Sequence, residues 1–293
     1  MKTFYKNLPV LVTGGAGFIG SHLVKKLVEL GANVTVLDVK KPNEKKINLV
    51  QASITDFQIC LAATKNKKIV FHLAAFVSVP ESVTNPQACH GTNINGTFNL
   101  LEACRLNNTQ TFIFSSSSAV YGPTEKSCCE TDTCKPISPY GMSKRVGELL
   151  CQQYAHTYGL QTGCLRYFNV FGENQNPNGP YAAVVPKFLQ RLEHNKPVTI
   201  FGDGLQTRDF IPVQKVVEAN LALGMQNKTV LDGRPFNIAT GTSITLLELF
   251  ENLKKDFPKY SQKPEFLPAR SGDLKHSHAN IHNWKTTFQK AEE

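Results

Sequence analysis

Short apolar runs and longer segments with a helical repeat of apolar positions alternate along the first half of the chain. Residues 10–12 and, apart from Asn33, residues 33–37 are apolar or β-branched, which is typical of buried strands. Residues 21–30, between them, carry apolar side chains at helical spacing until Gly31. Together the three segments predict a βαβ unit, in which a helix joins two parallel strands.

The same alternation continues as far as residue 166. Residues 69–73, 111–114 and 162–166 have the composition of strands, and residues 93–106 and 140–158 have the periodicity of helices. Repeated strand–helix units predict an α/β fold with a doubly wound parallel sheet that helices cover on both faces. Ligands of such sheets bind at the carboxyl ends of the strands.

The pattern changes after Phe171. Residues 172–180 are rich in Asn, Pro and Gly, and the elements that follow are shorter, whereas residues 210–239 return to the pattern of the main sheet. We therefore expect residues 1–171 and 210–239 to form a larger domain that binds a dinucleotide. Residues 172–209 and 240–293 are expected to form a smaller part that binds substrate.

Composition and charge exclude several classes of protein. Of the 293 residues, 41% are hydrophobic and 19% are charged, as in ordinary soluble proteins. The longest nearly apolar run, residues 69–79, is about half as long as the ~20 residues that a membrane span needs. The formal charge of +9 comes from scattered lysines without interleaved aromatic residues. We therefore expect no membrane and no nucleic acid as partners, but an anionic small molecule.

The eight cysteines indicate a reducing compartment. In a chain of this length with no export signal they are expected to be thiols, so we expect a cytoplasmic protein. Cys128, Cys129 and Cys134 cluster, but no second Cys or His pair follows at zinc-ligand spacing. We therefore expect no metal site.

A glycine-rich turn between the first strand and the first helix is the first candidate site. Gly14, Gly17 and Gly20 permit a tight turn, bring backbone N–H groups close to a pyrophosphate and let the helix pack closely. Within a βαβ unit, such a turn predicts a dinucleotide site.

The end of the second predicted strand indicates which dinucleotide binds. Asp38 lies where an acidic side chain would bind a ribose 2′-OH and repel a 2′-phosphate, which favours NAD over NADP. Lys40 and Lys41 follow closely and would weaken that preference, so use of NADP stays open.

Tyr140 and Lys144 are the second candidate site. Residues four apart share one face of a helix, so the Lys144 ammonium can lower the pKa of the phenol from about 10 towards neutrality. The strand at 111–114 runs into four consecutive serines, residues 115–118, upstream of this pair. The combination predicts a base beside the nucleotide.

Several short motifs follow one another along nearly the whole chain: residues 13–20, 72–75, 93 with 96–97, 115–122, 140–144, 166–172, 198–209 and 270–273. In this order they resemble the extended short-chain dehydrogenase/reductases, and within them the nucleotide-sugar epimerase/dehydratase group. The resemblance implies a Rossmann-type fold and NAD as the cofactor. Beyond the glycines and Asp38, it implies cofactor contacts from Phe18, Ile19, Ser53, Ile54, Leu73, Ala74, Ala75, Asn93, Ser115, Tyr140, Lys144 and Tyr167. Ser53 departs from the family pattern, which has an Asp there to hold the adenine.

The resemblance also implies a reaction. Tyr140 would take the proton of the sugar 4-OH while hydride passes from C4 to the nicotinamide, Lys144 would bind the nicotinamide ribose, and Ser117 would hydrogen-bond O4. Related dehydratases and decarboxylases carry a carboxylate after this serine, but residues 118–122 hold none. We therefore expect a 4-epimerase, in which a 4-keto sugar turns its other face and hydride returns to it.

Two other functions stay open at this point. A nucleotide-sugar 4-reductase would share Ser117, Tyr140 and Lys144 but would consume its reduced cofactor. A non-catalytic dinucleotide sensor on the same fold would need none of the three.

The later motifs imply the substrate, a UDP-sugar. Arg208 and Arg270 match family positions that grip the diphosphate, for which a planar cation is suited. A small residue at the position of Ser277 admits an N-acetyl group at C2, where a tyrosine excludes it. Substrate contacts are therefore expected from Ser78, Ser117, Asn169, Val185, Thr199, Phe201, Arg208, Arg270, Asp273 and Ser277. By analogy with relatives, the helices at 93–106 and 140–158 would pack in a homodimer.

Overall fold

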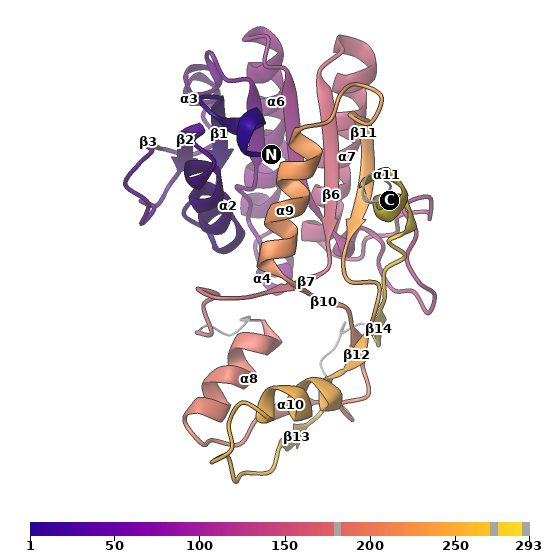
Figure 1. Ribbon diagram of the computed structural model, residues 1–293. Helices are drawn as coiled ribbons and strands as arrows, with labels where there is room; N and C mark the ends of the chain where they lie inside the picture. The colour runs from indigo at the N-terminus through magenta and orange to yellow at the C-terminus, as the bar shows by residue number, and fades with distance from the viewer. Residues whose placement is uncertain (179–182, 270–274, 289–293) are drawn as a thin grey trace.

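The computed structural model describes residues 1–178, 183–269 and 275–288. Its core is a seven-stranded sheet in which every neighbouring pair of strands is parallel (Figure 1). Its strands are β1 (Pro9–Thr13), β2 (Asn33–Asp38), β3 (Asn48–Gln51), β4 (Ile69–His72), β5 (Thr111–Ser117), β6 (Gln161–Tyr167) and β11 (Asp232–Ile238). The order is β11-β6-β5-β4-β1-β2-β3, so the direction of winding reverses between β1 and β4. The predicted doubly wound parallel sheet is confirmed.

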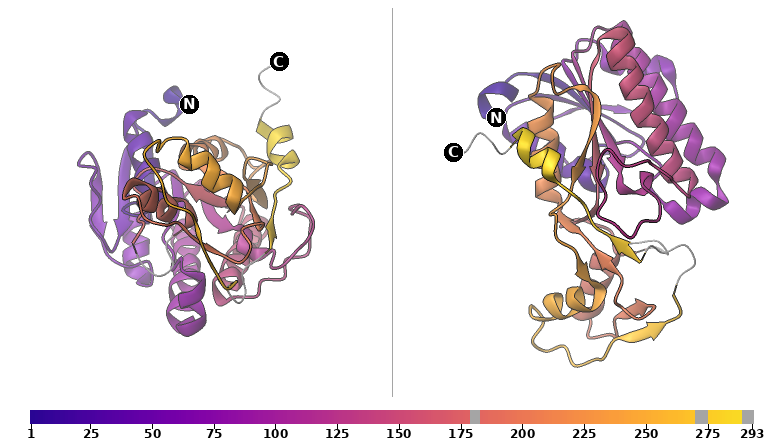
Figure 2. Two further views of the ribbon diagram at one scale, coloured as in Figure 1. Left: turned by 90° about the horizontal axis from the view of Figure 1, so that it is seen from below. Right: turned by 90° about the vertical axis from the view of Figure 1, so that its right-hand side faces the viewer.

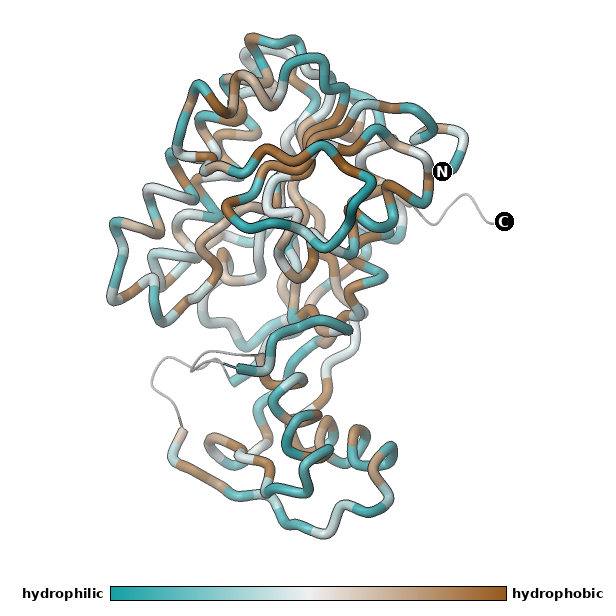
Figure 3. Tube along the Cα trace, turned by 90° about the vertical axis from the view of Figure 1, so that its left-hand side faces the viewer, coloured by the Kyte–Doolittle hydropathy of each residue, from teal (hydrophilic) through white to brown (hydrophobic). Residues whose placement is uncertain are grey.

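Two layers of helices cover the sheet because successive strand residues face opposite sides. Val10 and Val12 pack with α2 (Phe18–Glu29) and α9 (Val213–Gly224) in one hydrophobic cluster. Leu11 packs with α3 (Phe57–Thr64), α6 (Gly96–Leu106) and α7 (Pro139–Tyr158) in a second cluster. In Figure 3 the most hydrophobic stretches lie along the strands between these helices.

Short helical segments connect β4 to α6 and β5 to α7. These are α4 (Val79–Thr84), α5 (Pro86–His90), a π-helical turn (Gly91–Asn95) and a 3₁₀ turn (Ser118–Val120). The chain begins with the short α1 (Lys2–Tyr5), whose Tyr5 is fully buried against α9. These connections shape the edge of the sheet where the strands end.

A smaller part lies beyond the carboxyl ends of the strands (Figures 1 and 2). Its helices α8 (Val184–Glu193) and α10 (Leu246–Lys254) pack around Phe188, Ile200 and Phe250 with the parallel pair β8 (Thr199–Phe201) and β13 (Glu265–Leu267). Short strands connect it to the larger part: β7 (Asn169–Phe171) with β10 (Phe210–Pro212), and β9 (Thr207–Arg208) between β12 (Ile244–Thr245) and β14 (His276–Ser277).

The last described helix returns to the large sheet. In α11 (His282–Phe288), Trp284 and Phe288 pack on Phe236 of β11, with ring centroids 5.9 and 5.7 Å away. This segment lies within the range assigned to the smaller part, and the division into two domains stays a prediction. No helix in the three described ranges is long and apolar enough to cross a membrane.

Candidate active site

The glycine-rich turn opens into a cavity of about 670 Å³ at the carboxyl ends of the central strands. A Cβ on Gly20 would collide with the carbonyl oxygen of Gly14, so the tight turn requires glycine there. At Gly17, the N-cap of α2, a Cβ would have only the Gly14 oxygen nearby, at 3.2 Å, so the backbone faces open space. An N-terminal helix end beside such space is suited to a pyrophosphate. The site therefore fits a dinucleotide.

Asp38 closes the turn from the end of β2. Its two carboxylate oxygens accept the N–H groups of Ala16 and Lys40, each at 2.9 Å. A carboxylate has about four acceptor positions, so it can still accept a ribose hydroxyl. Asp38 lines the same cavity, as its predicted role requires.

Lys144 lies behind the predicted base. Its ammonium donates a 2.7 Å hydrogen bond to the carbonyl oxygen of Ser115 and lies 5.9 Å from the centre of the Tyr140 ring. Burial lowers the pKa of Lys144 to about 8, and the nearby Cys89 and Glu148 act in the opposite direction. Lys144 is only 4% exposed, and with a pKa of about 8 it is still mostly protonated at pH 7, so the protein interior holds a cation here.

Tyr140 has a pKa above its ordinary value. Burial raises the pKa most, and a hydrogen bond with the Ser117 side chain opposes the rise. The lowering of this pKa by Lys144, whose ammonium lies 5.9 Å from the centre of the ring, stays a prediction. The Ser117 side chain therefore favours the phenolate form of Tyr140.

Most of the predicted cofactor residues line one cavity. They are Gly14, Gly17, Phe18, Ile19, Gly20, Asp38, Ser53, Ile54, Leu73, Ala74, Ala75, Ser115, Tyr140, Lys144 and Tyr167, together with Ser117. Asn93 is not among the lining residues. Its amide donates to the Phe76 carbonyl and to Ser143, at 3.0 and 2.9 Å, and its oxygen accepts the Phe76 N–H at 2.7 Å. It thus holds the loop after β4 from behind.

A second cavity, of about 870 Å³, lies between the large sheet and the smaller part. Of the predicted substrate residues, Ser78, Asn169, Thr199, Phe201 and Arg208 line it. Val77 lines both cavities, so the two adjoin each other. A ligand in the second cavity can therefore reach towards Tyr140.

The remaining predicted substrate residues lie elsewhere. Val185 is buried in the core of the smaller part. Ser277 pairs with Arg208 in the β9–β14 ladder and does not line the second cavity. Arg270 and Asp273 lie outside the described residues.

Two cations that line the second cavity were not predicted from the sequence. Lys187 and Arg191 are four residues apart on α8 and line the cavity with Arg208. Among the described lining residues there is no carboxylate. The i, i+4 spacing was the available signal, but the sequence does not indicate which face of α8 is turned to the cavity.

His72 belongs to the motif at residues 72–75, but no role was predicted for it. Its ring nitrogens lie 2.7 Å from the Thr13 hydroxyl and 2.9 Å from the Thr97 hydroxyl. Burial lowers its pKa to about 3, with Lys144 acting in the same direction, so the ring is neutral. It joins β1, β4 and α6 directly behind the turn, and the motif at residues 72–75 was the signal for it.

The fold and the site together define a dinucleotide-binding α/β protein with a Tyr–Lys–Ser group at the switch point of the sheet. Residues 10–239 match the NAD dependent epimerase/dehydratase family, and the chain belongs to this family. The family is NAD dependent, which confirms the predicted cofactor.

Similar proteins carry several activities. A putative UDP-glucose 4-epimerase of Methanocaldococcus jannaschii is 41% identical over 256 residues, which cover 84% of this chain and 82% of the relative. The UDP-N-acetylglucosamine 4-epimerase of Methanobrevibacter ruminantium, solved in complex with UDP-N-acetylmuramic acid, has a TM-score of 0.89 and 38% identity, covering 96% of this chain and 91% of that one. The UDP-glucose 4-epimerase of Thermotoga maritima, solved with UDP-glucose, has a TM-score of 0.90 and 38% identity, covering 95% and 92%. A nucleotide-sugar decarboxylase and a 4,6-dehydratase also match.

Proposed function

We propose that the protein is an NAD-dependent 4-epimerase of UDP-sugars. The observation that carries this proposal is that Ser117, Tyr140 and Lys144 line the dinucleotide cavity where it adjoins a second, cation-lined cavity. The absence of a carboxylate from residues 118–122 favours epimerisation over dehydration and decarboxylation. The relatives that are 4-epimerases support the same choice.

In the proposed reaction, three side chains handle the sugar C4 hydroxyl. Tyr140 takes the proton from O4 and later returns it, and Ser117 donates a hydrogen bond to O4 as it gains carbonyl character. Lys144 keeps a positive charge beside Tyr140 and would contact the ribose of the cofactor. NAD, when bound, supplies the acceptance and return of a hydride.

The second cavity is the proposed site of the UDP group. Arg208 would hold the diphosphate, and Lys187 and Arg191 would add positive charge from α8. Thr199 and Phe201 would contact the base, and Asn169 and Ser78 the sugar and diphosphate. Arg270 and Asp273 are proposed for the same site from the family pattern alone.

We further propose that the substrates include UDP-GlcNAc and UDP-GalNAc. Ser277, next to Arg208 in the β9–β14 ladder, is small enough to leave space for an acetamido group. The similar enzyme of M. ruminantium is named for UDP-N-acetylglucosamine. UDP-glucose is the other substrate to be compared.

The test is turnover of purified protein on a panel of UDP-sugars, with and without the substitution Tyr140→Phe. We expect interconversion of UDP-GlcNAc and UDP-GalNAc, without net consumption of reduced cofactor. Loss of the phenol should lower kcat by about 10²–10⁴-fold, the usual contribution of a positioned acid or base.

Four outcomes would contradict the proposal or a part of it. Stoichiometric consumption of NADH or NADPH would identify a 4-reductase instead. Binding of NAD without any turnover would favour the dinucleotide sensor. Full activity of Tyr140→Phe would remove the tyrosine from the mechanism, and an enzyme that accepts UDP-glucose but not UDP-GlcNAc would contradict the role of Ser277.

We also propose that the protein is a cytoplasmic homodimer. The outer faces of α6 and α7 expose Phe98, Leu106, Met142, Leu149 and Tyr158, each 45–49% accessible. Two such helix pairs from two copies would bury these side chains in a four-helix bundle.

A further inference from the structure

Three residues one turn apart on α7 hold the three consecutive serines that end β5. The Ser117 side chain lowers the pKa of Tyr140 against the effect of burial, and Lys144 donates to the Ser115 carbonyl at 2.7 Å. Glu148, the next residue at i+4 spacing, accepts a 2.6 Å hydrogen bond from the Ser116 hydroxyl. The face that carries the proposed base and its lysine therefore continues to a third polar residue, which no step of the proposed mechanism uses.

Glu148 is fully buried and all of its acceptor positions are used. One carboxylate oxygen accepts from Ser116 and from Arg166 Nε, at 2.6 and 2.8 Å. The other accepts from Arg166 Nη2 and Arg145 Nη1, at 2.8 and 2.9 Å. Burial favours the neutral acid, but the hydrogen bonds and charge of Arg166 bring the pKa of Glu148 below its ordinary value. The carboxylate is thus ionised and fixed in place.

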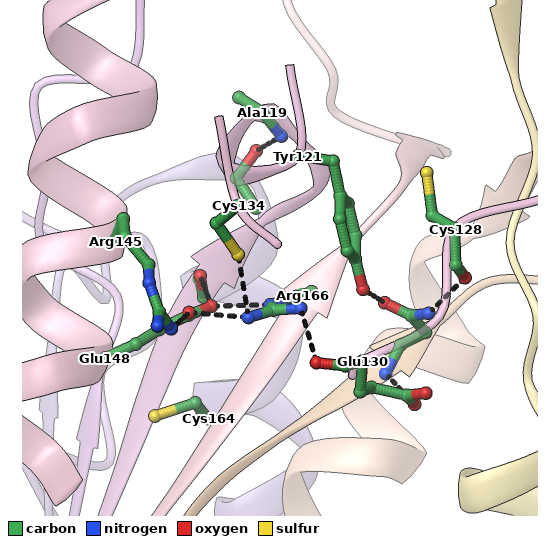
Figure 4. A network of polar contacts seen from close by, with 12 residues as sticks. Ala119, Tyr121, Cys128, Glu130, Cys134, Arg145, Glu148, Cys164 and Arg166 are labelled. Carbon is green, nitrogen blue, oxygen red and sulfur yellow. Dashed lines mark hydrogen bonds and ion pairs between the residues drawn. The ribbon is translucent and has the colours of Figure 1, made fainter. Parts of the chain in front are cut away.

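Arg166 is fixed equally firmly from the neighbouring strand. Its guanidinium is 1% exposed and lies 4.7 Å from the centre of the Tyr121 ring. It also donates to the Glu130 carbonyl at 3.4 Å and to the Cys134 sulfur at 3.3 Å (Figure 4). The charge pair consequently joins β6, α7 and the loop after β5 directly beneath the serines.

The helix is brought close enough for these contacts by Gly147. A Cβ at this position would collide with the ring of Phe114, which precedes Ser116 on the same face of β5. Glycine in a helix interior costs about 1 kcal/mol relative to alanine. The helix has a glycine next to Glu148, in spite of this cost, because only glycine lets α7 pack so closely on β5.

We propose that Glu148 is a positioning residue for the reaction: by holding Ser116 it fixes the end of β5 against α7, and so sets the distance between Ser117 and Tyr140. This inference rests on the proposed function for its kinetic consequence. A buried ion pair is often no more stabilising than an apolar pair of the same volume, so stability alone accounts poorly for this one.

The sharpest test is Ser116→Ala, which removes the link and leaves the Glu148–Arg166 pair intact. We expect kcat to fall about tenfold because Ser117 and Tyr140 lose their alignment, while KM for the UDP-sugar stays within about twofold. Bound NAD should be retained at the wild-type ratio. Amide exchange across residues 115–119, followed by mass spectrometry, should accelerate about tenfold as the end of β5 loosens.

The matched control is Thr162→Val. The Thr162 hydroxyl is fully buried and donates a 2.7 Å hydrogen bond from β6 to the Cys151 carbonyl of α7, so it also joins a strand to this helix, but far from the serines. We expect kcat and exchange at residues 115–119 to stay at wild-type values. Equal losses of kcat in the two variants would show a general stability effect and overturn the proposal.

Glu148→Gln and the double variant complete the design. If Ser116 acts through Glu148, adding Ser116→Ala to Glu148→Gln should lower kcat no further. Wild-type kcat and wild-type amide exchange in Ser116→Ala would overturn the positioning role even if Glu148→Gln fails to fold. A wild-type protein that epimerises no UDP-sugar would instead contradict the proposed function, and unchanged exchange at residues 115–119 would still decide the positioning role separately.

Discussion

Lys144 is a buried ammonium, and its position makes stability depend on pH. The pKa of this lysine falls from 10.5 to about 8 because burial disfavours the charge. Cys89 from α5 and Glu148 from α7 face it and favour the charge, while the neutral His72 of β4 lies nearby. Since the unfolded chain would hold this proton up to about pH 10.5, unfolding takes up a proton between pH 8 and 10.5, and stability should rise with pH in that range.

We expect the free energy of unfolding of the wild type to increase relative to Lys144→Met as the pH rises from 7.5 to 10. The limit is about 3 kcal/mol, because each unit of pKa difference corresponds to about 1.4 kcal/mol. Below pH 8 the difference between the two proteins should be constant. Urea unfolding of both proteins at four pH values measures this, and a difference that stays constant throughout would mean that Lys144 titrates as an ordinary exposed lysine.

At the scale of elements, α7 is the helix that organises the site. Ser138 caps its start by accepting the Gly141 N–H at 3.1 Å, and Gly159, with φ of +70°, ends it. Both residues are helix-end signals that can be recognised in the sequence. The predicted helix at 140–158 differs from the observed one by a single residue. The sequence predicted only part of the face of α7 that contacts β5, namely the positions of Tyr140 and Lys144.

Replacing Gly147 should disturb this helix more than replacing a glycine in open space. Gly147→Ala places a methyl group into the Phe114 ring, and overpacking of this kind costs about 1–3 kcal/mol. Gly91→Ala is the control, because a Cβ there meets nothing within 4 Å. We expect it to be neutral or to stabilise by up to about 1 kcal/mol. Thermal unfolding compares the two, and equal stability would show that α7 has room to shift away from β5.

The strands with continuous apolar runs were predictable, and the edge of the sheet was not. β1, β4 and the first half of β5 lie between two layers of helices, and their runs at residues 10–12, 69–71 and 112–114 are apolar and form a clear signal. β3 lies at the edge, where Asn48 and Gln51 are exposed and only two residues between them are half-buried. Four residues of mixed polarity carry no usable periodicity.

Only part of the candidate site, likewise, could be predicted from the sequence. The turn at Gly14, the proposed base Tyr140 and the serine at Ser117 each belong to a local motif, and all three line one cavity. The cations of α8 and the Ser116–Glu148 contact depend on tertiary packing between distant segments. Residue spacing cannot supply those contacts, because it does not determine which helix faces meet.

At the scale of the whole molecule, the outer face of α6 and α7 should control the oligomeric state. Leu149 is 47% exposed on α7, within the proposed dimer face. Leu149→Glu would place a carboxylate in a buried interface and should convert a dimer to a monomer. Leu205→Glu is the control, because Leu205 is 53% exposed in the smaller part of the molecule. Sedimentation velocity measures both, and a monomeric wild type would contradict the proposed homodimer.

At the scale of the whole molecule, two separate parts of the chain meet at the second cavity, the proposed substrate site. One side of the second cavity comes from residues 77–80 of the larger part, and the other from α8, β8 and β9. The loop after β4 contributes Val77 to both cavities and is held from behind by Asn93. One shared loop therefore bounds the two cavities that are proposed for cofactor and substrate.

The pairing of β14 with β9 holds Ser277 through its backbone, so its side chain can change during evolution. The Ser277 carbonyl accepts from the Asp209 N–H and the Ser243 hydroxyl, both at 3.1 Å, and so the backbone secures this position beside Arg208. A substitution at 277 can alter the side chain without removing those contacts. Under the proposed role of Ser277, a lineage could broaden or narrow its choice of sugar by a single mutation there, while Arg208, the proposed diphosphate anchor one strand away, is inherited unchanged.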